Sequence, residues 1–367
     1  MPYLTDMFHD QNGAVAQHDV AAKPVLAGFN PEAFADRLGE RILGQPHAVS
    51  AVARAVSIAH AGVTDPGRPL ASVLLVGPTG VGKTELVRQI AAELRSGPDD
   101  LCRIDMAALA QEHYAASFSG APPGYAGSKE SFTLFDKNKI EGDPYMPGIV
   151  LFDEVEKADP TVIRALLHVL DCGDLTLANG RETISFRNCY VFLTSNLGSR
   201  DVAAAQRAPR WASRWQRLRG ARSDSISSLS EAHELIAAAV EDFFDPEFFN
   251  RIDEMVIMKA FESSTARQVT AREVTLFTER LAHESVELRV PHDVVDFLHR
   301  CGFDPIYGAR GLRRTIRNHL IAPVAECVLR SRTARATPIT VAAAVVNGVI
   351  TAELIATSGG MARRVGD

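Results

Sequence analysis

The larger N-terminal part of the chain contains five short, mostly apolar segments, and stretches with helical spacing separate them. Consecutive apolar positions are typical of strands that are buried on both faces of a parallel sheet. Helical spacing begins near Glu32, and an alanine-rich helix is expected at 48–61. The pattern therefore predicts an α/β fold, a parallel sheet flanked by helices, with strands at 73–76, 102–106, 149–152, 190–193 and 254–258.

The C-terminal part has a different pattern. Apolar residues recur at helical spacing, first at Val274, Phe277 and Leu281 and again at 312, 316 and 320. The Asn-Gly pair at 347–348 lies between β-branched residues, which is a strong hairpin signal. A smaller, mainly helical subdomain closing in a β-hairpin is predicted. The expected organisation is a flexible arm at 1–33, a large subdomain at 34–258 with a divergent insert at 199–230, a small subdomain at 259–356 and a flexible tail at 357–367.

A glycine-rich loop follows the first predicted strand and precedes a helix. Glycines allow consecutive backbone N–H groups to face a triphosphate, and the following lysine and threonine suit phosphate and Mg²⁺. The alternative, a simple glycine-rich turn, receives little weight because every position of the pattern is filled. We therefore predict a P-loop that binds ATP and Mg²⁺, with Thr84 as a metal ligand and with these binding residues: Gly77, Pro78, Thr79, Gly80, Val81, Gly82, Lys83 and Thr84.

Polar residues follow two further strands. Asp153 and Glu154 end the strand at 149–152, and Asn196 follows the strand at 190–193. In a P-loop ATPase, Asp153 is expected to hold Mg²⁺ through water and Glu154 to polarise the attacking water. Asn196 can reach the γ-phosphate or the water. Taken singly, acidic residues and asparagine at strand ends are often only solvated turn residues.

Composition restricts the class of protein. The chain has 367 residues and a formal net charge of −6, which makes nucleic acid an unlikely principal ligand. Its five cysteines have no disulfide or zinc spacing, and we interpret them as buried thiols in a reducing compartment. No signal peptide or apolar segment long enough to span a membrane is evident. We expect a cytoplasmic protein.

Together these motifs make the chain resemble the Clp-type AAA+ unfoldases, most closely the second ATPase ring of ClpB-like disaggregases. The resemblance runs from about Gly39 to Leu354 and depends on motifs in the family order. They are Leu43-Gly44-Gln45, the P-loop, Gly120-Ala121-Pro122-Pro123-Gly124-Tyr125, the run 152–158, 194–198, Phe249-Asn250-Arg251-Ile252-Asp253, Gly302-Phe303-Asp304 and Tyr307-Gly308-Ala309-Arg310.

The resemblance implies further roles. Ile42 and Leu43 match nucleotide-contacting positions, and Arg251 matches an arginine finger that reaches the nucleotide of the neighbouring subunit. Arg310 matches a second sensor of the γ-phosphate, and Tyr125 matches the aromatic residue of a pore loop that grips a protein substrate. The family assembles into hexameric rings. Without this context, Arg310 is an ordinary surface arginine and Tyr125 part of a Pro-Gly turn.

The chain also departs from the family. No Ile-Gly-Phe or Ile-Gly-Leu tripeptide follows Asn196, so docking onto the Clp peptidase is not supported. The polar stretch 136–143 matches nothing in the family. The insert carries Trp211, Trp215 and several arginines; it either binds an acidic, nucleic-acid or membrane partner or simply packs onto the core. We expect an ATP-driven remodeller of proteins. The alternative is a nucleotide-dependent assembly switch that acts on a dedicated partner without threading.

Overall fold

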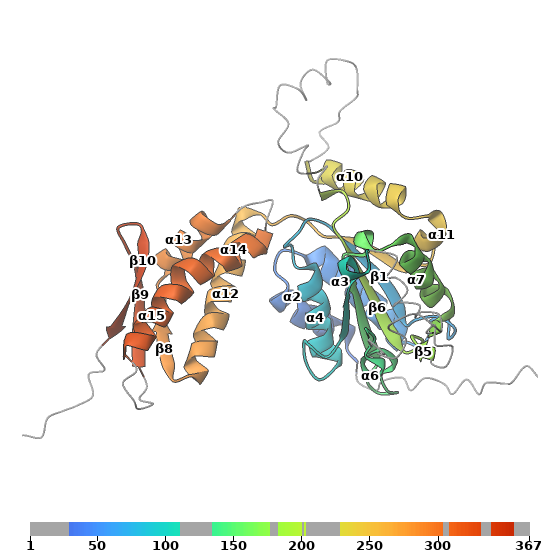
Figure 1. The fold of residues 1–367 in the computed structure, drawn as a ribbon, viewed down its shortest axis with the longest axis horizontal. Helices are drawn as coiled ribbons and strands as arrows, with labels where there is room; N and C mark the ends of the chain where they lie inside the picture. Colours follow the sequence, from blue (N-terminus) through green and yellow to red (C-terminus); the bar gives the residue numbers. More distant parts are fainter. Residues whose placement is uncertain are drawn as a thin grey trace, which may run out of the picture.

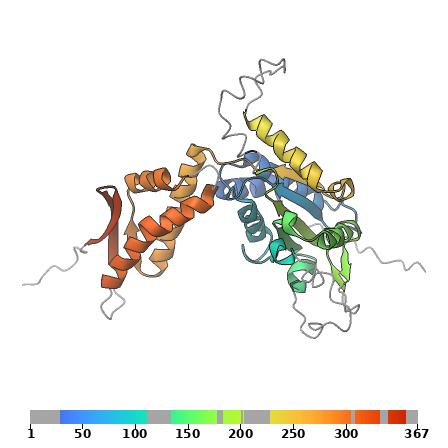
Figure 2. The same ribbon diagram turned by 45° about the horizontal axis from the view of Figure 1, so that its top comes forward.

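The computed structural model describes residues 29–110, 134–176, 183–199, 202, 228–303, 308–331 and 339–355. These residues form a large α/β subdomain and a smaller subdomain, which Figure 1 shows side by side. The same separation is visible after rotation (Figure 2). The polypeptide crosses between them after β7 (Glu254–Ile257), which leads into α12 (Ser263–His283).

Within the described residues, the large subdomain has a five-stranded parallel sheet of order β2-β3-β6-β1-β7. The five predicted strands are confirmed, with the first beginning two residues earlier than expected. Their bounds are β1 (Ala71–Val76), β2 (Cys102–Asp105), β3 (Gly148–Asp153), β6 (Cys189–Ser195) and β7.

Each face of the sheet is covered by its own layer of helices (Figure 1). One layer consists of α2 (Pro31–Arg41), α3 (Pro46–His60) and α4 (Lys83–Leu94). The other consists of α7 (Pro160–Cys172), α10 (Ser228–Phe243) and α11 (Pro246–Phe249). Shorter elements complete the subdomain: η1 (Met106–Leu109), α6 (Lys137–Glu141), η2 (Val155–Lys157), β4 (Asp174–Thr176) and β5 (Thr183–Ser185).

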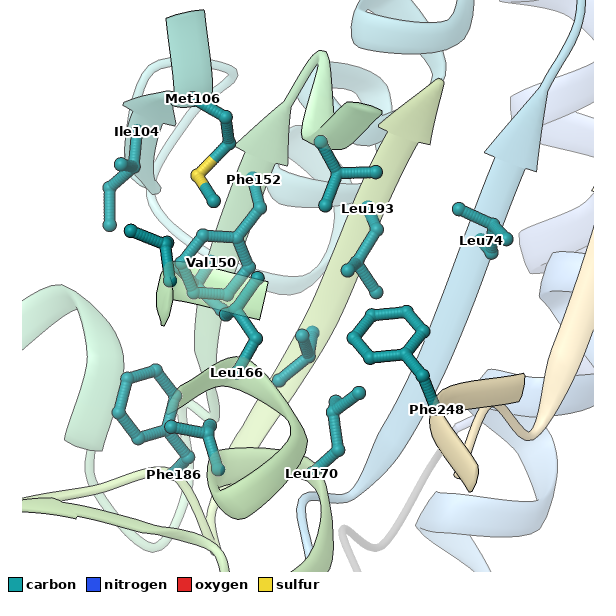
Figure 3. Packing of buried hydrophobic residues seen from close by; sticks show 14 of the residues in the cluster. Leu74, Ile104, Met106, Val150, Phe152, Leu166, Leu170, Phe186, Leu193 and Phe248 are labelled. Carbon is teal, nitrogen blue, oxygen red and sulfur yellow. The ribbon is translucent and has the colours of Figure 1, made fainter. Parts of the chain in front are cut away.

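Two hydrophobic cores explain why the strands are continuously apolar. Along β1, Val73 and Leu75 pack with the α2–α4 layer, whereas Leu74 and Val76 pack with the α7 layer. Successive strand side chains point to opposite faces, so a strand covered on both sides needs apolar residues at every position. Figure 3 shows the second core, in which residues of the four strands β1, β2, β3 and β6 meet helix α7 and Phe248 of α11.

The small subdomain combines helices with a second sheet. Its remaining elements are β8 (Val286–Arg289), α13 (His292–Gly302), α14 (Gly308–Ile316), the π-helical turn η3 (Arg317–Ile321), α15 (Ala322–Ser331), β9 (Ile339–Val346) and β10 (Val349–Ile355). The predicted hairpin is β9–β10, and Asn347 and Gly348 at its turn both have positive φ. Strand β8, which sequence reasoning did not anticipate, pairs in parallel with β9.

Several expected boundaries can be compared with the structure. Helix α2 begins at Pro31, inside the segment assigned to an N-terminal arm, and Asn30 caps it by accepting hydrogen bonds from two backbone N–H groups. The unmatched stretch 136–143 contains α6, capped by Asp136 and anchored by buried Ile140. Of the insert at 199–230, residues 200–201 and 203–227 lie outside the described residues, as does the tail at 357–367.

Candidate nucleotide site

The P-loop connects the C-terminal end of β1 to the N-terminus of α4. Its glycines adopt positive φ angles of 148° at Gly77, 79° at Gly80 and 101° at Gly82. A Cβ atom at Gly77 would lie 2.5 Å from the carbonyl oxygen of Met258. The sequence thus has glycine where the backbone conformation and the packing require it. The loop folds into a cradle at the start of α4, where the helix dipole favours an anion.

Lys83, the first residue of α4, is only 8% exposed. Its ammonium donates hydrogen bonds to the carbonyl oxygens of Gly77 at 2.6 Å and Pro78 at 2.9 Å. It also donates to Oδ1 of Asn196 at 2.8 Å. These bonds join the P-loop to the end of β6 and place a buried cation within the glycine cradle. The cradle and its donors therefore fit a phosphate group.

The environment of Lys83 shifts its pKa to about 8. Burial is the largest cause and lowers the pKa, because removal from water disfavours the charged ammonium. The charge of Arg310 lowers it further, while three carboxylates oppose the shift, namely Glu156, Asp153 and Glu154. The pKa of the Lys83 ammonium therefore depends on nearby charges of both signs as well as on burial.

Asp153 ends β3 and is 8% exposed. The Thr84 hydroxyl lies 3.4 Å from both of its carboxylate oxygens. Arg103 of β2 donates to Oδ2 at 2.6 Å, and the hydroxyl of Thr194 donates to Oδ1. Mg²⁺ takes oxygen ligands at about 2.0–2.1 Å, with neighbouring ligands about 3 Å apart, so the Thr84 and Asp153 oxygens fit a shared Mg²⁺ site. Sequence reasoning missed Arg103 and Thr194.

Glu154 follows β3 in a left-handed backbone conformation, with φ 61° and ψ 50°. A non-glycine residue in this region is uncommon and is often found at functional sites. Its backbone N–H donates to the Thr194 hydroxyl at 3.0 Å, and its carboxylate forms an ion pair with Lys157. After this turn the Glu154 carboxylate contacts Lys157, whereas the Asp153 carboxylate contacts Thr84 and Arg103.

Asn196 lies between a cation and a carboxylate. Its Oδ1 accepts from Lys83, while its backbone N–H and its Nδ2 both donate to Oε1 of Glu156, at 3.2 and 3.3 Å. Glu156 is a further site residue that sequence reasoning missed. Its signal was present, since it is the third carboxylate in the short run 153–156 that follows a buried strand.

Arg251 lies away from this group of residues. Its guanidinium pairs with Asp171 at 3.1 Å, and its carbonyl oxygen accepts from the Ser72 hydroxyl at 2.8 Å. Ser72 is at the start of β1, five residues before Gly77. At about 3.3 Å per strand residue, that spacing separates the two ends by about 16 Å. Arg251 therefore lies near the N-terminal end of β1, whereas its own P-loop follows the C-terminal end of that strand.

Helix α14 of the small subdomain reaches the P-loop. The backbone N–H of Ala309 donates to the carbonyl oxygen of Gly80 at 3.0 Å. Gly308 has φ 52°, and a Cβ there would lie 2.8 Å from the same oxygen. Arg310, the next residue, is exposed, and its charge acts on Lys83. Both sensor candidates, Asn196 and Arg310, are thus brought to the P-loop edge.

The segment before α3 lies at the junction of the two subdomains. Ile42 is buried and Leu43 is half-buried. Gln45 is 3% exposed, and its side chain exchanges two hydrogen bonds with the backbone of Lys259, donating at 2.7 Å and accepting at 3.1 Å. A cavity of about 250 Å³ lies beside it, lined by Gly44, Gln45, Pro46, His47, Ile257, Lys259, Ala260, Glu262 and Thr265.

Other expectations have mixed outcomes. Tyr125, Trp211 and Trp215 lie outside the described residues. All five cysteines are free thiols, as predicted. The prediction that all of them are buried was wrong, because Cys172 and Cys301, which lie at helix ends, are exposed. Within the described part of the chain, no group of three or more His, Cys, Asp and Glu side chains could hold a metal ion, and no helix combines the length and the apolar character of a membrane span.

Two family models match the chain. Residues 68–255 match the AAA domain (Cdc48 subfamily), and residues 262–341 match the C-terminal D2-small domain of ClpB protein. The first match spans the sheet from just before β1 into β7. The second covers most of the small subdomain. The matches follow the division into two subdomains.

Related proteins match the chain across both subdomains. An ATP-dependent protease ATP-binding subunit-like protein of Rhodococcus erythropolis is 61% identical over 352 residues, covering 95% of this chain and 98% of that protein. Chaperone protein ClpB 1 of Thermosynechococcus vestitus is 39% identical over 298 residues, which are 80% of this chain but only 31% of ClpB 1.

A solved structure of Hsp104 with ATPγS and FITC casein, in a closed state, is also similar. It has a TM-score of 0.72 and 29% identity, and the match covers 90% of this chain and 54% of that one. The fold, the P-loop with its surrounding carboxylates, both family models and these relatives lead to one conclusion. The chain belongs to the Clp-type AAA+ ATPases and is an ATP-hydrolysing enzyme.

Proposed function

We propose that this chain hydrolyses Mg²⁺-ATP in a ring-shaped homo-oligomer of six subunits and uses the energy to unfold or remodel proteins. The observation that carries the proposal is the convergence of Lys83, Thr84, Asp153 and Asn196 at one edge of the sheet, with α14 hydrogen-bonded to the P-loop. Phosphate-binding, metal-binding and polar sensing groups meet there, as hydrolysis of a triphosphate requires.

Each residue has a defined part in this proposal. Lys83 exchanges its internal acceptors for the β- and γ-phosphates, while the backbone of the P-loop surrounds them. Thr84 and Asp153 hold Mg²⁺, which supplies positive charge next to the phosphates. Glu154 leaves Lys157 to orient and polarise the attacking water. Asn196 contacts the γ-phosphate or that water.

The place of Arg251 supports a role between subunits. It lies about 16 Å along β1 from its own P-loop, so its guanidinium serves a neighbour's nucleotide more readily than its own. Arg310 supplies positive charge from the small subdomain and links the nucleotide to domain movement. Ile42 and Leu43, near the cavity at the subdomain junction, contact the nucleotide on the side of the base.

The protein-remodelling part of the proposal depends on relatives and on one residue. Hsp104 was solved with ATPγS and casein, and ClpB 1 is named a chaperone. In this chain Tyr125 supplies the aromatic ring that grips a polypeptide along the ring axis, by non-specific apolar contact. Because the chain spans about a third of ClpB 1, the substrates of that larger protein are not transferred to it.

One experiment tests the mechanism. A Glu154→Gln variant that binds ATP without hydrolysing it captures the bound protein, and mass spectrometry identifies that partner. Tyr125→Ala is then compared with wild type for ATP turnover and for remodelling of the captured partner. Retained turnover with most of the remodelling lost supports threading. Remodelling at the wild-type rate by Tyr125→Ala excludes threading.

A nucleotide-dependent assembly switch is the second candidate. The match covers 98% of the Rhodococcus protein, so a relative of nearly this length has no room for large additional substrate-binding domains. If the switch docks its partner through the insert, replacing Trp211 and Trp215 by alanine should abolish partner-stimulated hydrolysis without changing the melting curve. Tyr125→Ala should then have little effect.

A further inference from the structure

Glu156 has no part in the roles proposed above, yet it contacts the site directly. Its Oε1 accepts two hydrogen bonds from Asn196, one from the backbone N–H and one from Nδ2. Its Oε2 is buried, and no hydrogen-bond partner for it exists among the described residues. A buried carboxylate oxygen left unpaired costs free energy, so this position needs an explanation beyond packing.

The contacts of Glu156 determine which way the Asn196 amide faces. With Nδ2 toward the carboxylate, Oδ1 faces Lys83 at 2.8 Å and the Thr79 hydroxyl at 3.5 Å. The reversed amide would direct its N–H donors at the Lys83 ammonium and its carbonyl oxygen at the carboxylate. Both contacts would be repulsive, so the hydrogen-bond network permits one orientation.

Nucleotide binding changes one side of this arrangement. Once Lys83 turns toward phosphate oxygens, its bond to Asn196 Oδ1 is no longer available to fix the amide. The two bonds to Glu156 remain, because they lie on the other side of Asn196 from the lysine. Glu156 is then the group that keeps Oδ1, an acceptor, directed at the phosphate site, where it can accept a hydrogen bond from the attacking water.

We propose that Glu156 is a positioning residue for ATP hydrolysis, which holds the amide of Asn196 with its Oδ1 facing the P-loop. The inference rests on the proposed ATPase mechanism and assigns a cause to the orientation of its sensor. Under this proposal Glu156 affects the rate of the chemical step of ATP hydrolysis. Nucleotide affinity depends on the P-loop and Lys83, and Glu156 acts on Lys83 through its charge, which raises the pKa of that lysine, and not through a hydrogen bond.

The test compares two substitutions of Glu156. Glu156→Gln keeps a side-chain oxygen of the same reach and so preserves the two bonds from Asn196, whereas Glu156→Ala removes the acceptor. We expect Glu156→Ala to lower kcat by about tenfold to a hundredfold, the scale of a displaced catalytic group. Measured at about pH 6.5, below the Lys83 pKa of about 8, KM for ATP and the Kd of a fluorescent ADP analogue should change less than about twofold, because the lysine stays protonated after the Glu156 charge is removed. Glu156→Gln should restore most of the rate.

A double variant separates positioning from an independent effect. If Glu156 acts through Asn196, the double substitution by alanine should be no slower than Asn196→Ala alone. Losses that multiply in the double variant would overturn the proposal. So would a wild-type rate in Glu156→Ala, or a Glu156→Gln variant as slow as Glu156→Ala.

A second pair of variants applies if Glu156→Ala fails to fold, as judged by circular dichroism. Asn196→Asp opposes two carboxylates and should slow hydrolysis, and adding Glu156→Gln, whose amide can donate, should recover several-fold of the rate. No recovery would overturn the proposal. Inactive wild-type protein would instead contradict the proposed ATPase mechanism, as would full activity in Glu154→Gln.

Discussion

The Arg251 guanidinium lies 3.1 Å from the carboxylate of Asp171, with 37% and 42% of the two side chains exposed. An ion pair this exposed contributes at most about 1 kcal/mol, and a stronger anion can replace it. The backbone of Arg251 is held more firmly, because its carbonyl oxygen accepts from Arg68 and Ser72, each at 2.8 Å. A fixed backbone with an exchangeable guanidinium suits an arginine that reaches a neighbouring subunit.

Arg251→Ala should bind ATP normally but hydrolyse it at least about tenfold more slowly, since arginine fingers contribute much of the charge stabilisation in the transition state. Mixing it with Glu154→Gln subunits should partly restore activity. Some mixed interfaces then combine an intact Arg251 with an intact Glu154. The measurement is ATPase rate against mixing ratio.

Asp171→Asn is the matched control for this experiment. It removes the ion pair within the subunit but leaves the finger, so the assembled enzyme should be at least as active as wild type. Full activity of Arg251→Ala, together with a rate per subunit that does not depend on protein concentration, would contradict a finger acting between subunits.

Lys83→Ala should lose nucleotide binding, whereas Glu154→Gln should keep it and lose turnover. The lysine substitution removes a charge-assisted contact to the phosphates, while the glutamine leaves the cradle intact and removes only the polarisation of water. Titration with a fluorescent ATP analogue and a steady-state ATPase assay measure the two effects. Equal ATP affinity in wild type and Lys83→Ala would contradict the assignment of Lys83.

Nucleotide affinity should depend on pH because the pKa of Lys83 is lowered to about 8. Phosphate groups favour the protonated ammonium, so affinity should be full below pH 8 and should fall above it, by up to about tenfold per pH unit. Lys83→Arg is the control, since a guanidinium remains protonated in this range. A flat wild-type profile between about pH 7 and pH 9.5 would show that this lysine does not titrate in the site.

Gln45→Ala should destabilise the protein by about 1–3 kcal/mol, because it removes two hydrogen bonds between a buried amide and the backbone of Lys259. The melting temperature should fall by several degrees. Gln89→Ala, which removes a half-buried glutamine that, among the described residues, hydrogen-bonds only the side chains of Glu85 and Arg41, should have a smaller effect, because water can replace these partners. Equal melting temperatures for wild type and Gln45→Ala would mean that this junction is not limiting for stability.

The strands and the P-loop could be predicted because their signals are local. A strand buried on both faces must be apolar at successive positions, and the positive φ angles of the cradle require glycine at 77, 80 and 82. The chain order of strand and helix then places the lysine and the threonine. None of these inferences needs contacts between distant segments.

Residues whose role comes from a distant contact were missed. Arg103 is separated from Asp153 by 50 residues, and the two meet only because β2 and β3 are neighbours in the sheet. Glu156 likewise meets Asn196 only through the adjacency of β3 and β6. The prediction that all cysteines are buried was wrong for another reason. Cysteine is usually buried, but Cys172 is the last residue of α7, where the helix meets solvent.

The hydrogen bond between Ala309 and Gly80 connects main-chain atoms at both ends. Replacing larger side chains with alanine therefore leaves this bond in place, and a scan of that kind does not detect it, whereas Gly308→Ala would disturb it because the added Cβ would lie 2.8 Å from the Gly80 oxygen. A proline at 309 would delete the donor, although its ring also constrains the preceding residue. Because the bond does not depend on side chains, the residues around it can change while its geometry is kept. Covariation between positions 80 and 309 should therefore be weak.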